Sequence, residues 1–284
     1  MRMMFALLCA GALLGATWAD EAKLTTRPDA LVVVVMDPLA LPLSCPCVKG
    51  YAQRDYDQLG KWLEQKLGRP VQVFFDESLV VAMSKKSGGR ADLIIGKCSV
   101  VKHDAARAKL KVQQVAALSG KDGATTQTGL IVVPAKDPAK TAADLKGYRI
   151  IFGPEECDEK SAAAVALLKN HGVAIPAKLE TRAACSEGAE IIIEKGPDAK
   201  NAAVISSYAA PLLEGCGNVP KGALRVVGTT EPVPFVGAFV NEALPAPDRD
   251  ALRAALMIVG EEATLLTALE TKHGFVALGA VKKK

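Results

Sequence analysis

A regular alternation of short apolar runs with helical stretches constrains the fold more than any other feature of this chain. Residues 31–36 form a continuous apolar run, which is typical of a strand buried on both faces. A helix is expected over residues 55–67, where leucines recur on one face and Gly68 and Pro70 follow. A strand, a helix and a strand should follow at residues 71–75, 78–86 and 91–95. This βαβαβ order predicts an α/β fold with mixed, mostly parallel sheets and helices on both faces.

The same alternation starts again in the middle of the chain. Strands are expected at 149–152, 178–181, 203–205, 224–227 and 235–240, and helices at 142–146, 159–171, 186–195, 208–213, 247–259 and 261–271. We therefore predict a second lobe, residues 131–232, inserted into a first lobe made of residues 20–130 and 233–284. The two crossings between lobes should lie near Thr128–Val133 and Pro232–Val240. Ligands of open α/β sheets bind beyond the carboxyl ends of the strands, so two facing lobes predict a cleft between them.

The first 19 residues have the pattern of a cleavable secretory signal peptide. Arg2 precedes an apolar run over residues 3–14, and the small residues Thr17 and Ala19 place cleavage before Asp20. An uncleaved interfacial helix is the alternative. The chain lacks a run of about 20 consecutive apolar residues, so it is not expected to span a membrane. We expect a periplasmic or otherwise exported protein.

Composition and motifs argue against two broad classes of function. The formal net charge is +4 with both signs interspersed, and aromatic residues make up only 5% of the chain, which gives no support to nucleic-acid binding. His103, His171 and His273 fit no metal-binding or nucleophile spacing, and no phosphate-binding glycine motif occurs. The protein is therefore not expected to be an enzyme.

Five short passages resemble one known family in matching order. Residues 141–153, with Ala-Asp-Leu-Lys-Gly before a strand and a glycine, resemble the opening of the second lobe of type II periplasmic solute-binding proteins. Residues 56–68, 91–96, 129–138 and 230–235 match further family passages, and together they extend over nearly the whole mature chain. Among these proteins the chain is most similar to the phosphate, phosphite and phosphonate-binding group.

This resemblance implies a two-lobed type II periplasmic-binding-protein fold with a ligand cleft between the lobes. It implies a monomer that captures a small molecule, such as phosphate, phosphonate or a related oxyanion, and delivers it to the permease of an ABC transporter. Three alternatives stay open on the same scaffold: a binder of a soft metal or redox cofactor, an accessory protein that uses the cleft to contact another exported protein, and an enzyme.

The chain departs from the family at the start of the second lobe's helix. There the family has a Ser/Thr-rich loop that holds the anionic head group, whereas this chain has Pro154-Glu-Glu-Cys-Asp-Glu159. Four carboxylates would repel an anion. Alternatively, they satisfy the N-terminus of the helix, a position that suits acidic side chains.

Polar residues near the predicted strand ends are the candidate ligand contacts. They are Tyr51, Lys97, Ser99, Thr125, Thr126, Thr128, Glu156, Cys157, Ser206, Ser207 and Tyr208. Ser206 and Ser207 can equally be explained as helix caps. Lys97 and Arg182 could neutralise an anionic ligand, but an exposed charge is the favoured interpretation of each, since basic side chains are mostly found at the surface.

Six cysteines remain after the signal peptide is removed. Five of them follow strands or precede helices on the expected cleft side: Cys45, Cys47, Cys98, Cys157 and Cys185. Such thiols would suit a soft metal such as Cu(I), or a redox-active pair. Disulfides are the favoured interpretation in an oxidising compartment, and no cofactor is then expected. Cys216, between two glycines, is expected to be peripheral.

Overall fold

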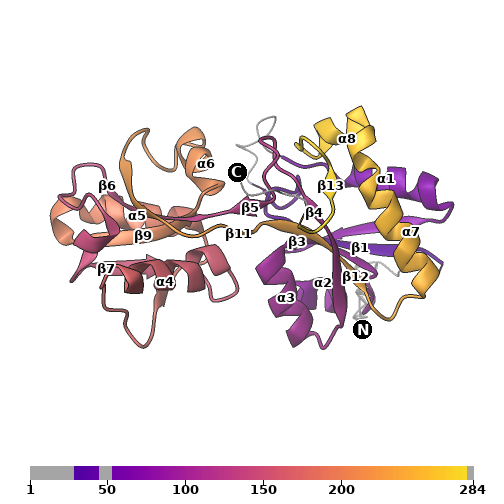
Figure 1. The fold of residues 1–284 in the computed structure, drawn as a ribbon, viewed down its shortest axis with the longest axis horizontal. Helices are drawn as coiled ribbons and strands as arrows, with labels where there is room; N and C mark the ends of the chain where they lie inside the picture. Colours follow the sequence, from indigo (N-terminus) through magenta and orange to yellow (C-terminus); the bar gives the residue numbers. More distant parts are fainter. Residues whose placement is uncertain (1–28, 45–52, 280–284) are drawn as a thin grey trace, which may run out of the picture.

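Two α/β lobes lie side by side and are joined by a pair of extended strands (Figure 1). The structure is a computed structural model, and it describes residues 29–44 and 53–279. Each lobe has one mixed sheet with helices on both faces, which confirms the predicted fold class.

The first lobe is built on a six-stranded sheet in the order β13-β4-β12-β3-β1-β2. Its strands are β1 Leu31–Met36, β2 Val71–Phe75, β3 Leu93–Lys97, β4 Val112–Leu118, β12 Val236–Asn241 and β13 Phe275–Val276. β1 pairs in parallel with β2 and β3, whereas β12 pairs antiparallel with both β3 and β4. The carboxyl ends of β1 and β3 therefore lie at the same edge of the sheet.

Helices cover both faces of this sheet (Figure 1). α1 Tyr56–Leu67, α7 Ala246–Met257 and α8 Ala263–Ala268 pack on one face, and α2 Leu79–Lys85 and α3 Cys98–Arg107 pack on the other. A short 3-10 turn, Val259–Glu261, links α7 to α8. α1 begins where the Asp55 carboxylate accepts the backbone N–H groups of Asp57 and Gln58, and it ends at Gly68, whose φ of 61° is left-handed.

The second lobe has a five-stranded sheet in the order β10-β6-β9-β7-β8. Its strands are β6 Gly129–Pro134, β7 Arg149–Phe152, β8 Glu180–Thr181, β9 Asn201–Ser206 and β10 Leu224–Thr229. α4 Ala162–Asn170 covers one face, while α5 Cys185–Lys195 and α6 Ala209–Gly215 cover the other. Three 3-10 turns complete it: η2 Ala142–Leu145, η3 Asp158–Lys160 and η4 Pro197–Ala199.

The strands between the lobes are shorter than predicted. β5 Thr126–Gln127 and β11 Val233–Pro234 pair antiparallel and form the connection. Most of the two segments expected to cross, Thr128–Val133 and Pro232–Val240, instead belongs to the sheets. From Gly129 the chain pairs with β9, and from Val236 it pairs with β3, so inter-strand hydrogen bonds hold these residues inside the lobes.

Two further differences from the sequence analysis affect the site. β4, with the sequence VQQVAAL, was not predicted, because polar glutamines interrupt its apolar pattern. The helix predicted over residues 159–171 is divided into η3 and α4, and α4 starts only at Ala162. Over the described ranges the helices are too short or too polar for any of them to cross a membrane.

Candidate functional site

A cavity of about 410 Å³ lies between the two lobes. The first lobe supplies residues at the carboxyl ends of β1 and β3, and the second supplies the loop after β7 and the segments that start α5 and α6. Its lining is Met36, Pro38, Leu39, Leu43, Ser44, Glu77, Lys97, Val100, Pro154, Glu156, Cys157, Lys160, Ala183, Ala184, Cys185, Ser186, Tyr208, Ala209, Leu212, Leu213, Cys216 and Asn218. The cavity thus occupies the position predicted for the ligand cleft.

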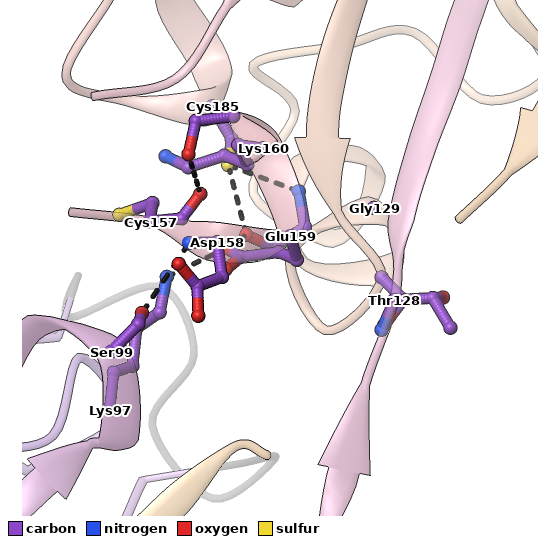
Figure 2. A network of polar contacts seen from close by, with 12 residues as sticks. Lys97, Ser99, Thr128, Gly129, Cys157, Asp158, Glu159, Lys160 and Cys185 are labelled. Atoms are coloured by element: carbon purple, nitrogen blue, oxygen red, sulfur yellow. Dashed lines mark hydrogen bonds and ion pairs between the residues drawn. The ribbon is translucent and has the colours of Figure 1, made fainter. Parts of the chain in front are cut away.

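A buried ion pair joins the lobes beside this cavity. Lys97, the last residue of β3, donates from Nζ to Oε1 of Glu159 in η3 over 2.6 Å. The side chains are 6% and 0% exposed. Figure 2 shows Lys97 and Ser99 of the first lobe extending toward Asp158 and Glu159 of the second. Ser99 Oγ accepts the backbone N–H of Asp158 at 3.4 Å, so a second, weaker contact accompanies the pair.

Both members of this pair stay charged at neutral pH. Burial alone would raise the pKa of Glu159, but Lys97 and the Ser206 hydroxyl outweigh burial and lower it. Burial alone would lower the pKa of Lys97, but Glu159 and the Cys157 thiol raise it overall. The interpretation of Lys97 as an exposed charge is therefore wrong, because the lysine is buried and its charge is balanced from the other lobe.

Ser206 and Ser207, at the end of β9, are not helix caps. α6 begins at Ala209 without a side-chain cap. Ser206 is fully buried, and its Oγ donates to Oε1 of Glu159 at 2.5 Å. Ser207 Oγ accepts the backbone N–H of Thr128 at 3.1 Å. The two serines therefore hold Glu159 and the first connection in place.

Close backbone approach fixes the loop that carries Glu159. A Cβ added to Gly129 would lie 1.9 Å from the carbonyl oxygen of Glu159, so only glycine allows η3 to lie against β6. A Cβ on Gly153 would lie 2.5 Å from Cβ of Lys160, whose side chain covers this position. Lys160 Nζ donates to the carbonyl of Ala183 at 3.2 Å. The loop is thus held from both of its ends.

The acidic loop does not serve mainly to satisfy the N-terminus of α4, as one interpretation predicted. Asp158 and Glu155 are exposed, Glu156 lines the cavity, and Glu159 is buried in its ion pair. The helix starts after all four carboxylates, at Ala162. One carboxylate of the loop therefore faces the other lobe, where it holds Lys97.

A second buried polar network follows β1. Asp37 is fully buried, and its Oδ2 accepts from Nη1 of Arg54 at 2.7 Å and from the Tyr56 hydroxyl at 2.5 Å. Arg54 also lies over the ring of Phe235, with its guanidinium carbon 5.6 Å from the ring centroid. The sequence analysis missed this network, although Asp37 directly follows the predicted first strand.

Tyr208 lines both the first cavity and a second one of about 390 Å³. Its ring stacks on Phe235 with centroids 5.0 Å apart, and burial raises the pKa of its hydroxyl well above the usual value. The second cavity is lined by Leu39, Arg54, Gly120, Lys121, Asp122, Ala124, Thr126, Gln127, Ser207, Tyr208, Phe235 and Glu270. It lies beside the connecting strands, so the cleft has two chambers.

Comparison with known proteins fits this architecture. A family model described as "ABC transporter, phosphonate, periplasmic substrate-binding protein" matches residues 51–280. The chain belongs to this family. A search among curated proteins found no match.

Solved structures of other type II binding proteins share the fold of this family member. A Xanthomonas citri protein bound to ATP has a TM-score of 0.64 at 14% identity, covering 89% of this chain and 92% of its own. PhnD1 from Prochlorococcus marinus, in complex with methylphosphonate, has a TM-score of 0.62 at 14% identity, covering 88% and 93%. A binding protein component of a phosphonate ABC transporter from Pseudomonas aeruginosa has a TM-score of 0.59 at 16% identity, covering 88% and 81%. At these sequence identities the comparison shows a shared fold and carries no further conclusion.

The cysteines of this family member divide into two groups. Cys157 and Cys185 line the first cavity, as expected, and both are free thiols. Cys98 is also free, but it packs in the core of the first lobe against Gln114, and burial raises its pKa to about 11. Cys98 is therefore wrongly predicted as a cleft ligand. Its side chain points into the α2–α3 core, because it leaves the helix on the apolar face.

The expectation of disulfide bonding is wrong for three of the described cysteines and is met at a fourth. Cys98, Cys157 and Cys185 are free, whereas Cys216, expected to be peripheral, lines the first cavity and is disulfide-bonded. Within residues 29–44 and 53–279, no group of three or more His, Cys, Asp or Glu side chains is arranged to hold a metal ion. Cys45, Cys47 and Tyr51 lie outside the described residues.

The threonine candidates belong to the connection between the lobes. Thr126 lines the second cavity. The carbonyl of Thr125 accepts the backbone N–H of Phe235, and the carbonyl of Thr128 accepts that of Ser207. These last two residues contribute backbone contacts and line neither cavity. Arg182 pairs with Glu180 at 3.1 Å at the side of the second lobe.

Proposed function

We propose that this chain is an exported solute-binding protein that captures a small ligand between its lobes and delivers it to the permease of an ABC importer. The observation that carries the proposal is the cavity of about 410 Å³, whose walls come from both lobes. A ligand held there contacts both lobes at once, so binding favours the closed arrangement about the β5–β11 connection. Membership of the periplasmic substrate-binding family supports this role. The proposed role is transport binding, with no catalytic step.

The proposed ligand class is a small oxyanion, such as phosphate or a phosphonate. Two nearly buried lysines, Lys97 and Lys160, line the cavity. Glu159 balances the charge of Lys97, and the ammonium group of Lys160 supports an anion. Methylphosphonate is bound by a structural relative, PhnD1 from Prochlorococcus marinus. Glu77 and Glu156 also line the cavity and weaken its positive potential, so we expect a modest affinity for anions.

Binding of a soft metal is a second candidate function. Cys157 and Cys185 are free thiols that line the same cavity, and thiolates prefer soft ions such as Cu(I). Burial raises the pKa of Cys157, and the ammonium groups of Lys97 and Lys160 offset this only in part. A thiol that is protonated at neutral pH is a weak ligand and a weak nucleophile, which favours the oxyanion proposal.

Titration of the mature protein, residues 20–284, separates these functions. Methylphosphonate, inorganic phosphate and Cu(I) are titrated by calorimetry, with thermal unfolding as a second readout. We expect an oxyanion to bind and to raise the midpoint of unfolding, because a ligand that binds only the folded state stabilises it. Lys160→Met should weaken that binding, and Cys185→Ser should leave it unchanged.

Binding of Cu(I) that is lost in Cys185→Ser, without any oxyanion binding, would favour the metal-binding function. If none of the three ligands binds to the folded protein, the cleft does not capture a solute of either class. The role as an accessory protein for another exported protein would then replace the proposal.

A further inference from the structure

We propose that Glu159 is a tethered carboxylate that occupies the anion position of the cleft, so that it holds the lobes together and competes with oxyanion ligands. This inference rests on the proposed function, because it concerns the same cleft. Glu159 would then affect both the closure of the two lobes and the charge of the ligands that the cleft accepts.

The donors around Glu159 are arranged as they would be around a bound oxyanion. Its Oε1 accepts from the Lys97 ammonium of the first lobe at 2.6 Å and from the Ser206 hydroxyl of the second lobe at 2.5 Å. Both donors come from the carboxyl ends of sheet strands, β3 and β9, and both are buried. A cation and a hydroxyl that meet on one oxygen from opposite lobes form a charge-assisted anion site, which the chain fills with its own carboxylate.

The backbone holds the carboxylate at this position. The carbonyl of Glu159 lies so close to Gly129 that a methyl group there would be only 1.9 Å from its oxygen. The next residue, Lys160, accepts from the backbone N–H of Gly153 at 3.1 Å and so closes the loop. Across the cleft, Ser99 Oγ accepts from the backbone of Asp158. Glu159 is therefore presented to Lys97 by a loop with little freedom.

One oxygen of Glu159 makes the contact between the lobes reversible. Oε2 is buried, and no group among the residues that the structure describes donates a hydrogen bond to it. A buried charged acceptor without a partner loses its hydration and gains nothing in exchange, so it favours opening of the cleft. The two donors on Oε1 favour closure and the unpartnered Oε2 opposes it. The contact thus behaves as a latch and not as a permanent bridge.

The charge of Glu159 also sets which ligands the cleft accepts. An oxyanion that enters must take Lys97 and Ser206 from Glu159, and it then lies next to a carboxylate of the same sign. Like charges at close range in a poorly hydrated site are costly. Glu159 therefore lowers the affinity of the cleft for anions. Glu159→Gln keeps the size of the side chain, removes its charge and leaves Lys97 available.

Titration of wild type and Glu159→Gln with inorganic phosphate tests the competition. We expect about a tenfold or larger decrease in the dissociation constant for Glu159→Gln, which corresponds to about 1.4 kcal/mol. Glu155→Gln is the matched control: it makes the same charge change in the same loop, but its side chain is exposed, and affinity should stay within about twofold. Equal affinities of the two variants would overturn the competition.

Small-angle X-ray scattering without any ligand tests the latch separately. We expect a larger radius of gyration for Glu159→Gln than for wild type and Glu155→Gln, because the lobes separate when the pair is lost. Ser206→Ala is a second variant, to be used if Glu159→Gln folds poorly. It removes one donor without leaving a buried charge unpaired, so its radius of gyration should increase less than that of Glu159→Gln. Unchanged scattering of both folded variants would refute the latch.

These experiments distinguish the failure of this inference from the failure of the proposed function. If the variants expand but no form of the protein binds phosphate or methylphosphonate, the latch stands and the oxyanion proposal falls. If wild type binds phosphate as tightly as Glu159→Gln and neither variant expands, solute capture stands and the role of Glu159 falls.

Discussion

Replacing Gly129 by alanine tests whether the loop that carries Glu159 lies where the structure places it. The added Cβ would be 1.9 Å from the carbonyl oxygen of Glu159 and 3.0 Å from Cγ2 of Thr230. Real Cβ atoms essentially never approach a heavy atom more closely than 3.0 Å, so η3 and β6 must separate by about 1 Å. Both segments are backbone, and no flexible side chain can move aside to remove the clash.

The cost can be worked out from the contacts that depend on this approach. Overpacking of a well-packed site costs about 1–3 kcal/mol. A 1 Å displacement also lengthens the bond from Gly129 N–H to Thr230 Oγ1, now 2.8 Å, and that from Ser206 to Glu159, now 2.5 Å. Each is worth about 1 kcal/mol. We therefore expect Gly129→Ala to lower the free energy of unfolding by about 3–5 kcal/mol.

Denaturant unfolding followed by circular dichroism measures this loss, and Gly188→Ala is the control. Gly188 lies inside α5, where a new Cβ would be 3.4 Å from Cβ of Ala203, an ordinary contact. Alanine in a helix is favoured over glycine by up to about 1 kcal/mol, so this variant should be neutral or more stable. If Gly129→Ala loses less than about 1 kcal/mol, η3 does not press against β6 and the argument for a fixed Glu159 fails.

Three further predictions concern the buried groups of the site. Because the pKa of Glu159 is lowered from its ordinary value of 4.5, its ionised carboxylate stabilises the fold above pH 4.5, and this stabilisation is lost as the pH falls through the lowered pKa. When the free energy of unfolding is measured against pH, wild type and Glu155→Gln should both show this loss in acid, and Glu159→Gln should not. Lys97→Met should lower the free energy of unfolding by about 3–5 kcal/mol, because it leaves a buried carboxylate unpaired. The double variant Lys97→Met, Glu159→Gln should recover most of this loss, and additive losses in the double variant would contradict the coupling. Alkylation of the native protein, followed by peptide mass spectrometry, should label partly exposed Cys185 well before Cys98, whose pKa is about 11; equal rates would place Cys98 at the surface.

Much of the fold could be predicted from apolar patterning. The strands at Leu31–Met36, Val71–Phe75 and Arg149–Phe152 have the predicted bounds, because each is a short apolar run followed by a turn or loop. β4 could not be recognised in this way. It lies near the edge of its sheet, between β12 and the two-residue β13, so several of its side chains remain polar. Local pattern gave no signal for a strand that depends on its neighbours.

The site could be predicted only in part. Lys97 and the loop up to Glu159 were both recognised as unusual, one as a cleft cation and one as a cluster of acids. Their pairing depends on how two separately folded lobes face each other, because Lys97 and Glu159 lie 62 positions apart in the sequence. Nor does local spacing reveal that Cys98 points into a core while Cys157, at another helix start, faces the cavity. Side-chain direction at a strand end is set by tertiary packing.

The position of β12 has a consequence for how the chain reaches its native state. β12 lies between β3 and β4, although more than 100 residues of sequence separate it from either strand's end, and the second lobe's strands all fall within that interval. Because the polypeptide is synthesised from its N-terminus, residues 129–229 can complete the sheet of the second lobe while the sheet of the first lobe still lacks β12. Until Val236–Asn241 arrives, β3 and β4 present unpaired edges, and such edges pair readily with other chains. The lobe that begins first is therefore completed last, and the incomplete first sheet is the stage of biogenesis at which a chaperone would matter most.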